Sequence, residues 1–415
     1  MTLKATVVSM LPPSLIIAGT RVSLDPRDPV FVHDPYPAYD AMRAAGPVFF
    51  WEQYGHWCAA SHDVISALLK DRRFGRQILH VSTRQALGWP EPPPHLAPFH
   101  AAERHSLLEL EPPDHTRLRG LVNRAFVSRQ VKRLRPRIEA LSHRLIDGFA
   151  GKSRVDLLDA LATPIPVIVI AELLGVPTDR APQLLDWSHK MVAMYQFRRS
   201  RQIEDDAVAA TVDFVAFLRG HIAEKRRNPA DDLISTLIAA TEAGDRMSED
   251  ELISTLILIL NAGHEATVHA IGNGVKAMLE HGIDPGAGPL GGLVEELLRF
   301  DAPLHMFTRF ALEDCDAFGA SFRQGDVIGL LLGAANRDPA RFAEPQRLDP
   351  ARAPNPHLSF GAGIHFCVGA ALARLELEVA LPILFQRLPG LRLTAQPVYR
   401  DTYHFHGLER LDVTW

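Results

Sequence analysis

The sequence of 415 residues predicts a mainly α-helical fold with small β-sheets, an α+β architecture. Long stretches carry apolar residues at three- and four-residue spacing, the longest over residues 249–281, which predicts amphipathic or buried helices. Short runs rich in β-branched and aromatic residues concentrate at about 25–75 and 303–335, which predicts strands there. No Ser/Gly-rich linker and no repeat divides the chain. We therefore expect one domain over residues 1–415, helical outside those two β-rich parts.

The N-terminal quarter of the chain combines short helices with a hairpin. Residues 36–44 have helical spacing, and residues 48–51 and 56–59 flank a turn, which predicts two antiparallel strands. Ser61 is suited to start a helix that runs to about Leu69. Residues 75–103 lose all periodicity in a proline-rich run, so we expect a long irregular connection.

Helical patterns dominate the rest of the chain. Pro112 and Pro113 favour a helix start, and that helix is expected to continue through Phe126. Further helices are expected over residues 128–149, 161–174, 184–194, 205–226, 249–281 and 293–299. Residues 303–310 and 327–332 read as strands, and the chain ends in short strand-like pieces.

Composition and charge restrict the class of protein. Hydrophobic residues make up 47% of the chain, which is ample for a deep core, and the net charge of -5 gives no case for nucleic-acid binding. Three scattered cysteines do not form a disulfide framework, which indicates a reducing compartment. The apolar stretch at residues 11–19 is interrupted by prolines and is far shorter than the ~20 residues of a membrane span. We expect a soluble, cytoplasmic protein.

A glycine-rich stretch at residues 357–374 delivers Cys367 to the start of a helix. A thiol there faces unpaired backbone N–H groups and the positive end of the helix dipole, which favour the thiolate. Gly361 and Gly363 allow a large flat group to approach the backbone closely, and Gly369 removes a side chain early in the helix. This pattern suits a soft iron ligand beneath a macrocycle.

Two other interpretations of the same residues exist. A lone cysteine is often a small buried hydrophobe. A zinc site is the other option, because His365 and Cys367 stand two apart and His404 and His406 repeat that spacing. Structural zinc sites usually contain cysteines two to four residues apart, and this sequence has no such pair.

The stretch strongly resembles the cytochrome P450 haem-thiolate monooxygenases, whose signature is Phe-Gly-x-Gly-x-His-x-Cys-x-Gly. All six fixed positions are matched, by Phe360, Gly361, Gly363, His365, Cys367 and Gly369. The resemblance implies haem b as cofactor, Cys367 as the iron ligand and His365 as a partner of a haem propionate. It also implies the cytochrome P450 fold, with haem between a long central helix and the helix after the cysteine loop.

The resemblance extends to residues 249–281, which match the family's central helix. Ala262 and Gly263 would bend this helix and make room for dioxygen, and Glu265 would relay protons. The family usually has a threonine directly after the acid, whereas this chain has Ala266 there and Thr267 one place later. Taken without the resemblance, the stretch is a core helix with one glutamate that reaches the surface.

Three further positions acquire expected roles from the family. His115 and Arg119 lie four residues apart and so share a helix face, and the family uses this pair on a haem propionate. Arg309 matches a further propionate arginine. Without the cysteine motif, the pair would be interpreted as a solvated basic face.

The resemblance also implies a buried Glu–Arg pair that holds the fold. It falls on Glu296 and Arg299, and Arg347 completes it. Electron donors of the family dock beside the cysteine, where Arg73, Arg117 and Arg352 could attract an acidic ferredoxin.

The expected function is therefore insertion of one oxygen atom of O2 into an apolar small molecule, with electrons from ferredoxin and ferredoxin reductase. A peroxide-driven peroxygenase and a non-catalytic haem protein that binds ligands are the alternatives. Glu265 argues against the peroxygenase, because such members tend to lose the acid and carry an arginine over the haem. The sequence leaves the substrate open, since family specificity lies in loops, here about 76–104, 180–200, 303–308 and 399–406.

Overall fold

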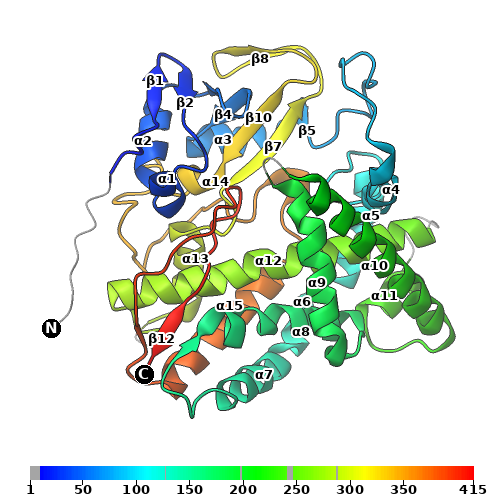
Figure 1. The fold of residues 1–415 in the computed structure, drawn as a ribbon, viewed down its shortest axis with the longest axis vertical. Coiled ribbons are helices and arrows are strands. Elements are labelled where there is room, and N and C mark those ends of the chain that lie inside the picture. The colour runs from blue at the N-terminus through cyan, green and yellow to red at the C-terminus, as the bar shows by residue number, and fades with distance from the viewer. Residues whose placement is uncertain (1–9, 127, 197–198, 241–245, 287) are drawn as a thin grey trace.

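Helices form most of the protein in the computed structural model, which describes residues 10–126, 128–196, 199–240, 246–286 and 288–415 (Figure 1). The helices are α1 (Pro29–His33), α2 (Tyr36–Ala44), α3 (His62–Leu68), α4 (Ala97–Glu103), α5 (Asp114–Ala125), α6 (Ser128–Arg133), α7 (Arg135–Asp147), α8 (Pro164–Leu174), α9 (Ala181–Val192), α10 (Arg201–Arg227), α11 (Leu233–Ala239), α12 (Glu249–His281), α13 (Leu290–Phe300), α14 (Leu332–Ala335) and α15 (Ala370–Arg387). The expected mainly α fold with small sheets is confirmed.

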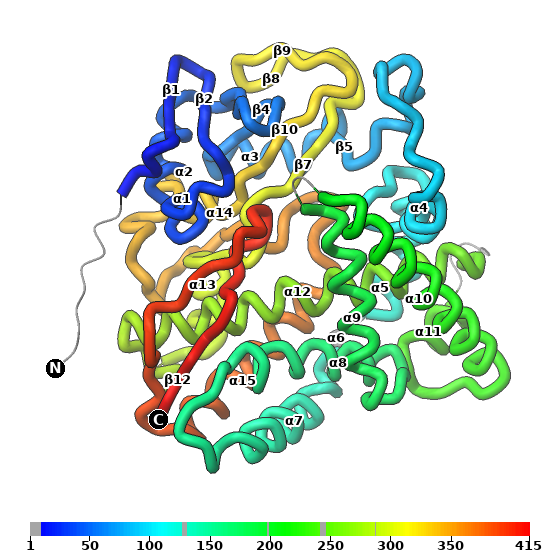
Figure 2. The backbone as a smooth tube through the Cα atoms, in the orientation of Figure 1, coloured from blue at the N-terminus to red at the C-terminus, as the bar shows by residue number. Residues whose placement is uncertain are grey.

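The strands form one larger sheet and two small ones. They are β1 (Ile16–Ala18), β2 (Arg21–Ser23), β3 (Phe49–Trp51), β4 (His56–Ala59), β5 (Phe74–Gly75), β6 (Val155–Asp156), β7 (Met306–Ala311), β8 (Cys315–Ala317), β9 (Ala320–Phe322), β10 (Val327–Leu331), β11 (Arg392–Leu393) and β12 (Asp412–Thr414). The larger sheet has the order β1-β2-β3-β4-β10-β7-β5, so β10 and β7 lie among N-terminal strands. Figure 2 shows β10 and β7 beside the N-terminal strand β4.

Helix α12 crosses the middle of the molecule and organises the helical layer (Figure 1). Ser248 and Glu251 form a capping box at its start, and Gly282 ends it with a left-handed backbone at φ 64°. Its buried side chains pack against α8, α13 and α15 in one apolar cluster and against α9 and α10 in a second. The helix is therefore held on both sides along its length.

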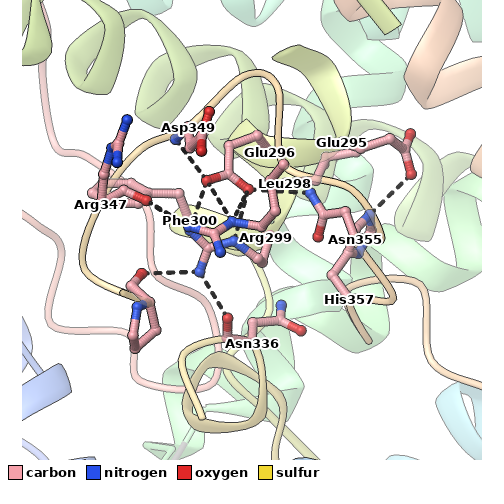
Figure 3. Close-up of polar contacts among 12 residues, drawn as sticks. Glu295, Glu296, Leu298, Arg299, Phe300, Asn336, Arg347, Asp349, Asn355 and His357 are labelled. Carbon is pink, nitrogen blue, oxygen red and sulfur yellow. Dashed lines mark hydrogen bonds and ion pairs between the residues drawn. The ribbon is translucent and has the colours of Figure 1, made fainter. Parts of the chain in front are cut away.

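A buried ion-pair network joins α13 to the segment before the cysteine loop (Figure 3). Arg299 makes a bidentate pair with Glu296 at 2.7 and 2.8 Å, and both side chains are fully buried. Arg352, not Arg347, completes the set, with Nε 3.1 Å from both Glu296 carboxylate oxygens. Arg347 contributes only its backbone carbonyl to Arg299, and its side chain is exposed beside Glu344. The expectation for Arg347 is therefore wrong.

The element boundaries mostly follow the sequence pattern, with several differences. Strands β1 and β2 lie before the expected β-rich part 25–75, and helices α1 and α14 were not expected. Helix α4 and a 3-10 turn occupy the end of the stretch 75–103 that we expected to be irregular. The expected helix 128–149 is divided into α6 and α7, because Pro136 in the first turn of α7 favours a new helix start. Helix α11 was not expected at all. Among the residues that the structure describes, no helix is long and apolar enough to span a bilayer.

The C-terminal turn reaches back to the start of β7. The His305 amide donates to the His404 carbonyl at 2.7 Å, and the His406 amide donates to the Pro303 carbonyl at 2.9 Å. These bonds fix residues 399–406 against residues 303–308. Two of the segments expected to determine specificity thus meet.

Candidate active site

The cysteine loop ends directly before α15, so the Cys367 thiol lies at a helix N-terminus. The Cys367 amide donates to the Phe360 carbonyl at 2.9 Å, which closes the loop. Many protein atoms surround the Cys367 thiol, but the residue still has a large accessible surface. This combination indicates that the thiol faces a space inside the protein. Burial raises the pKa of Cys367, while backbone N–H groups of Gly369 and Ala370 and the charge of Arg119 act to lower it. A cation above the sulfur would favour the thiolate further.

Glycines and an aromatic ring shape the loop around this thiol. Gly363 has φ 71°, and a Cβ there would lie 2.3 Å from the Leu69 carbonyl oxygen, so no other residue fits. Gly361 also adopts a left-handed backbone, at φ 67°. Gly369 is the N-cap residue of α15, and a Cβ there would remain 4.0 Å from the Cys367 sulfur. The Phe360 ring lies 4.4 Å from the guanidinium of Arg374.

Helix α5 brings a buried histidine next to the loop. The ring of His115 lies 4.5 Å from the ring of His365 between centroids, and neither His115 ring nitrogen has a hydrogen-bond partner. Burial lowers the pKa of His115 to about 4 in this setting. The His365 Nε2 atom is 3.5 Å from Glu111, without a hydrogen bond. Arg119, one turn after His115, donates to the Phe366 carbonyl at 2.6 Å.

Strand β7 contributes a buried cation to the same region. Arg309 is 2% exposed, and among the described residues no carboxylate lies within ion-pair distance of it. Burial and the neighbouring Arg76 lower the pKa of Arg309 to about 9. A buried, unpaired guanidinium is costly, and an anionic group beside it would remove that cost.

The middle of α12 presents small side chains. Ala262 is exposed although its neighbours along the helix are largely buried, and Ala266, four residues on, is partly buried on the same face. Gly263 instead faces α8, because a Cβ there would lie 2.6 Å from the Cδ1 atom of Ile170. Thr267 is buried, and its hydroxyl donates to the Gly263 carbonyl at 3.1 Å. The helix remains α-helical through this stretch.

Glu265 lies among three histidines. Its carboxylate oxygens are 3.4 Å from His264 Nε2, 3.2 Å from His269 Nε2 and 3.5 Å from His189 Nε2. Burial acts to raise the pKa of Glu265, but the contacts with His264 and His269 outweigh it and hold the pKa well below its usual range. The sequence motif indicated the acid, whereas His189 comes from α9, and no spacing in the sequence could have linked it to Glu265.

The expected residues thus fall into two groups. Cys367, His365, His115 and Arg119 meet around the cysteine loop, and Ala262 and Ala266 share one face of the central helix. The structure does not bring together the residues of the zinc interpretation. His406 is hydrogen-bonded to Asp301 and lies beside His305, whereas His365 lies beside His115. Arg76 and Glu111 were not expected near the site.

A thiol at a helix start, together with a long central helix that has small residues in its middle, defines a haem-thiolate protein in terms of fold and site. Residues 290–391 match the family profile described as Cytochrome P450. The chain is 37% identical to the biotin biosynthesis cytochrome P450 of Bacillus subtilis (strain 168) over 393 residues, 93% of this chain and 97% of that protein. It is 36% identical over 403 residues to the cytochrome P450 monooxygenase PikC of Streptomyces venezuelae, with 93% and 92% covered.

Solved structures agree with the sequence comparison. The structure of P450BioI in complex with an acyl carrier protein that carries hexadec-9Z-enoic acid has a TM-score of 0.85 and 36% identity, over 93% of this chain and 99% of that one. The chain belongs to the cytochrome P450 family, and its activity is that of a cytochrome P450 monooxygenase. Its cofactor is a haem held through a thiolate.

The residues present fit that cofactor. A haem carries two propionates, and the structure holds a buried guanidinium at Arg309 without an ion-pair partner and a buried imidazole at His115 without a hydrogen-bond partner. The accessible Cys367 sulfur supplies the soft ligand. The two propionates would thus provide anionic partners for buried polar groups that otherwise have none.

Proposed function

We propose that this monooxygenase inserts one oxygen atom from O2 into an apolar small organic molecule and receives two electrons from a separate ferredoxin, which a ferredoxin reductase reduces. The observation that carries the proposal is the Cys367 thiol, which opens onto an internal space at the start of α15. When bound, the haem supplies the activation of dioxygen. The residues of this chain hold the cofactor, bind the substrate and deliver protons.

Cys367 binds the iron, and His115, Arg119, Arg309 and His365 bind the propionates. The charge argument supports this assignment, because Arg309 is buried without a carboxylate within ion-pair distance in the described chain. Phe360, Gly361 and Gly369 shape the loop that carries the ligand. A peptide carbonyl occupies one side of Arg119, so its remaining N–H groups are the ones available to a propionate.

Glu265 delivers protons in the proposed mechanism. His189 is 49% exposed in its side chain and lies 3.5 Å from Glu265, which provides a route for protons from solvent to a largely buried carboxylate. Ala266 has no hydroxyl, and the Thr267 hydroxyl is used by the Gly263 carbonyl. Ordered water held by Glu265, or a hydroxyl of the substrate, takes the place of the usual threonine.

The substrate belongs to an apolar class. Large apolar side chains are exposed on or next to the segments expected to cover the pocket, at Leu79, Val81, Tyr195 and Val398. One solved relative, the myxobacterial CYP267B1, is a complex with myristic acid, and P450BioI carries a C16 acyl chain on its partner. A first panel therefore contains long-chain fatty acids beside terpenoid and aromatic compounds.

The experiment is a binding titration followed by the spin-state shift of the haem band. Compounds that bind close to the haem should shift the band, and the best binders are then tested for turnover. Turnover with reduced ferredoxin and ferredoxin reductase, compared with turnover with peroxide alone, separates the proposal from the peroxygenase alternative. Equal or higher turnover with peroxide would contradict it.

Two further parts of the proposal concern the whole chain. We infer that residues 1–415 act as one domain, since β10 and β7 complete a sheet begun by the N-terminal strands. We also infer a cytoplasmic location, because Cys58, Cys315 and Cys367 are all free thiols.

A further inference from the structure

Three imidazole nitrogens surround the Glu265 carboxylate between α9 and α12. His189 Nε2 lies 3.5 Å and His264 Nε2 3.4 Å from Glu265 Oε2, and these three ligand atoms are mutually within 4.8 Å. The rings of His189 and His264 are 5.5 Å apart between centroids. His269 Nε2 approaches the other carboxylate oxygen, Oε1, at 3.2 Å.

His264 shows most directly that a cation belongs in this cluster. Its Nδ1 atom lies 2.9 Å from the Leu260 carbonyl oxygen, which can only accept, so Nδ1 carries a proton. In the neutral ring, Nε2 then holds a lone pair, and Nε2 is fully buried without a hydrogen-bond partner. That lone pair would lie 3.4 Å from Glu265 Oε2, and a proton or a metal ion held by both atoms would remove the repulsion between them.

The two long distances at Glu265 Oε2 are compatible with a metal ion between the ligand atoms. Hydrogen bonds between N–H and carboxylate oxygen are typically about 2.7–2.9 Å, which is shorter than the 3.4 and 3.5 Å found at Oε2. Two ligands at about 2.0–2.1 Å from a tetrahedral zinc ion are about 3.3 Å apart. We propose that His189, His264 and Glu265 form a two-histidine, one-carboxylate site for a divalent transition metal, with Zn²⁺ as the reference ion.

The surroundings supply what such a site needs besides ligands. Nδ1 of His264 donates to Leu260, and His269 holds the second carboxylate oxygen, so a ligand histidine and the ligand carboxylate are both oriented by neighbours. His189 is half exposed, which gives an entry path and leaves room for water as a fourth ligand.

A second cluster, Asp301 with His305 and His406, shows the contrast. His406 Nδ1 is 2.7 Å from Asp301, and His406 Nε2 is 3.2 Å from the Val32 carbonyl, so both nitrogens are used in hydrogen bonds. The Tyr399 hydroxyl donates to the same carboxylate at 2.6 Å. His305 Nε2 has no hydrogen-bond partner and lies 3.8 Å from Asp301. Hydrogen bonds already use both His406 nitrogens and both Asp301 oxygens, so we propose no metal there.

A metal at Glu265 would join α9 to α12 and occupy the carboxylate that the proposed mechanism uses for protons. Zinc should therefore inhibit turnover. The metal site itself rests on geometry alone, so its test does not depend on activity.

The test is calorimetric titration of the tag-free holoenzyme with Zn²⁺, together with zinc content after equilibrium dialysis. We expect one zinc ion per chain that is lost, or bound about tenfold or more weakly, in His189→Ala and in Glu265→Gln. His189 is half exposed, so its replacement should leave folding intact, and the carbon-monoxide band of the ferrous protein verifies this.

His281→Ala is the matched control, because His281 is an exposed histidine of the same helix at its far end. It should retain the full stoichiometry and affinity. The proposal is overturned if the wild-type holoenzyme binds no zinc at one equivalent, or if His189→Ala and Glu265→Gln bind it as well as His281→Ala does. If no zinc binds, a proton rather than a metal ion lies between His264 and Glu265.

Discussion

Cys367 is the residue on which the proposed chemistry depends most. Cys367→Ser and Cys367→His should abolish monooxygenation, because neither hydroxyl nor imidazole reproduces thiolate donation to iron. The measurement is the carbon-monoxide difference band of the ferrous protein, which should lose its thiolate-dependent red shift. Cys315→Ser serves as the control, since Cys315 lies on β8 in the small two-stranded sheet. A Cys367 variant with the wild-type band would disprove the assignment.

The residues after Glu265 allow a second test at this scale. Glu265→Gln should lower product formed per electron pair about tenfold or more, with electrons diverted to peroxide, because the amide cannot relay protons. Thr267→Ala should have a much smaller effect, since its hydroxyl is buried and bonded to the Gly263 carbonyl. The comparison includes Ala266→Thr, which restores the usual hydroxyl. If uncoupling occurs only in the Thr267 variant, then Thr267 is the true replacement.

At the scale of elements, Arg352 and Arg347, which both lie on the segment after α14, allow a matched comparison of two variants. Arg352→Ala should reduce the free energy of unfolding by about 1.5–3 kcal/mol, because Glu296 is fully buried and loses a charged hydrogen-bond donor. Arg347→Ala should change it by less than about 0.5 kcal/mol, since that side chain is exposed. Denaturant unfolding of the two variants measures the difference, and equal losses would refute the structural assignment.

Helix α15 contains a buried acid that makes stability depend on pH. Glu376 is 1% exposed, one carboxyl oxygen has no hydrogen-bond partner, and burial raises its pKa to about 8. The unfolded chain loses this proton near its ordinary pKa of 4.5, while the folded chain keeps it until about pH 8. The contribution of Glu376 to the free energy of unfolding is therefore fully present below about pH 4.5. It falls as the pH rises from about 4.5 to about 8 and stays constant above about pH 8.

Glu376→Gln should remove this slope. The variant should melt at a higher temperature than the wild type at pH 8 and at a similar temperature near pH 5. Melting curves across that range measure the effect. If the melting temperatures of the wild type and of Glu376→Gln change with pH in parallel, Glu376 does not titrate as described.

At the scale of the whole molecule, electron transfer depends on docking of a partner. Reduction by an acidic ferredoxin should slow as ionic strength rises from ~0.1 M to ~1 M, because the Debye length falls from about 10 Å to about 3 Å. Arg73, Arg117 and Arg352 are already paired with Asp71, Glu251 and Glu296, so none of the three provides a free charge. A reduction rate that is indifferent to salt would argue against electrostatic docking.

The sequence predicted elements well where one periodic pattern covered several turns. Residues 249–281 and 36–44 were correct to the residue, because apolar spacing and end signals agree there. Helix α11 was missed, although Asp232 caps its start and α3, which has the same length of 7 residues, was predicted. The cysteine loop was recognisable because its contacts are local in the chain.

Partners that meet only through tertiary packing could not be predicted in the same way. Arg347 and Arg352 are five residues apart on an irregular segment, and no periodicity determines which one turns toward Glu296. The position of His189 beside Glu265 depends on how α9 crosses α12. Such pairs are properties of the packed chain and leave no local signal.

The interleaved strand order of the large sheet also has a consequence for biosynthesis. Trp57 of β4 pairs with Ile328 of β10, and β5 pairs only with β7 among the strands of its sheet. A ribosome that adds roughly 5–20 residues per second needs tens of seconds to reach the second partner after the first. The nascent N-terminal strands therefore emerge long before β10 exists, with one edge uncovered, and are candidates for chaperone binding during translation.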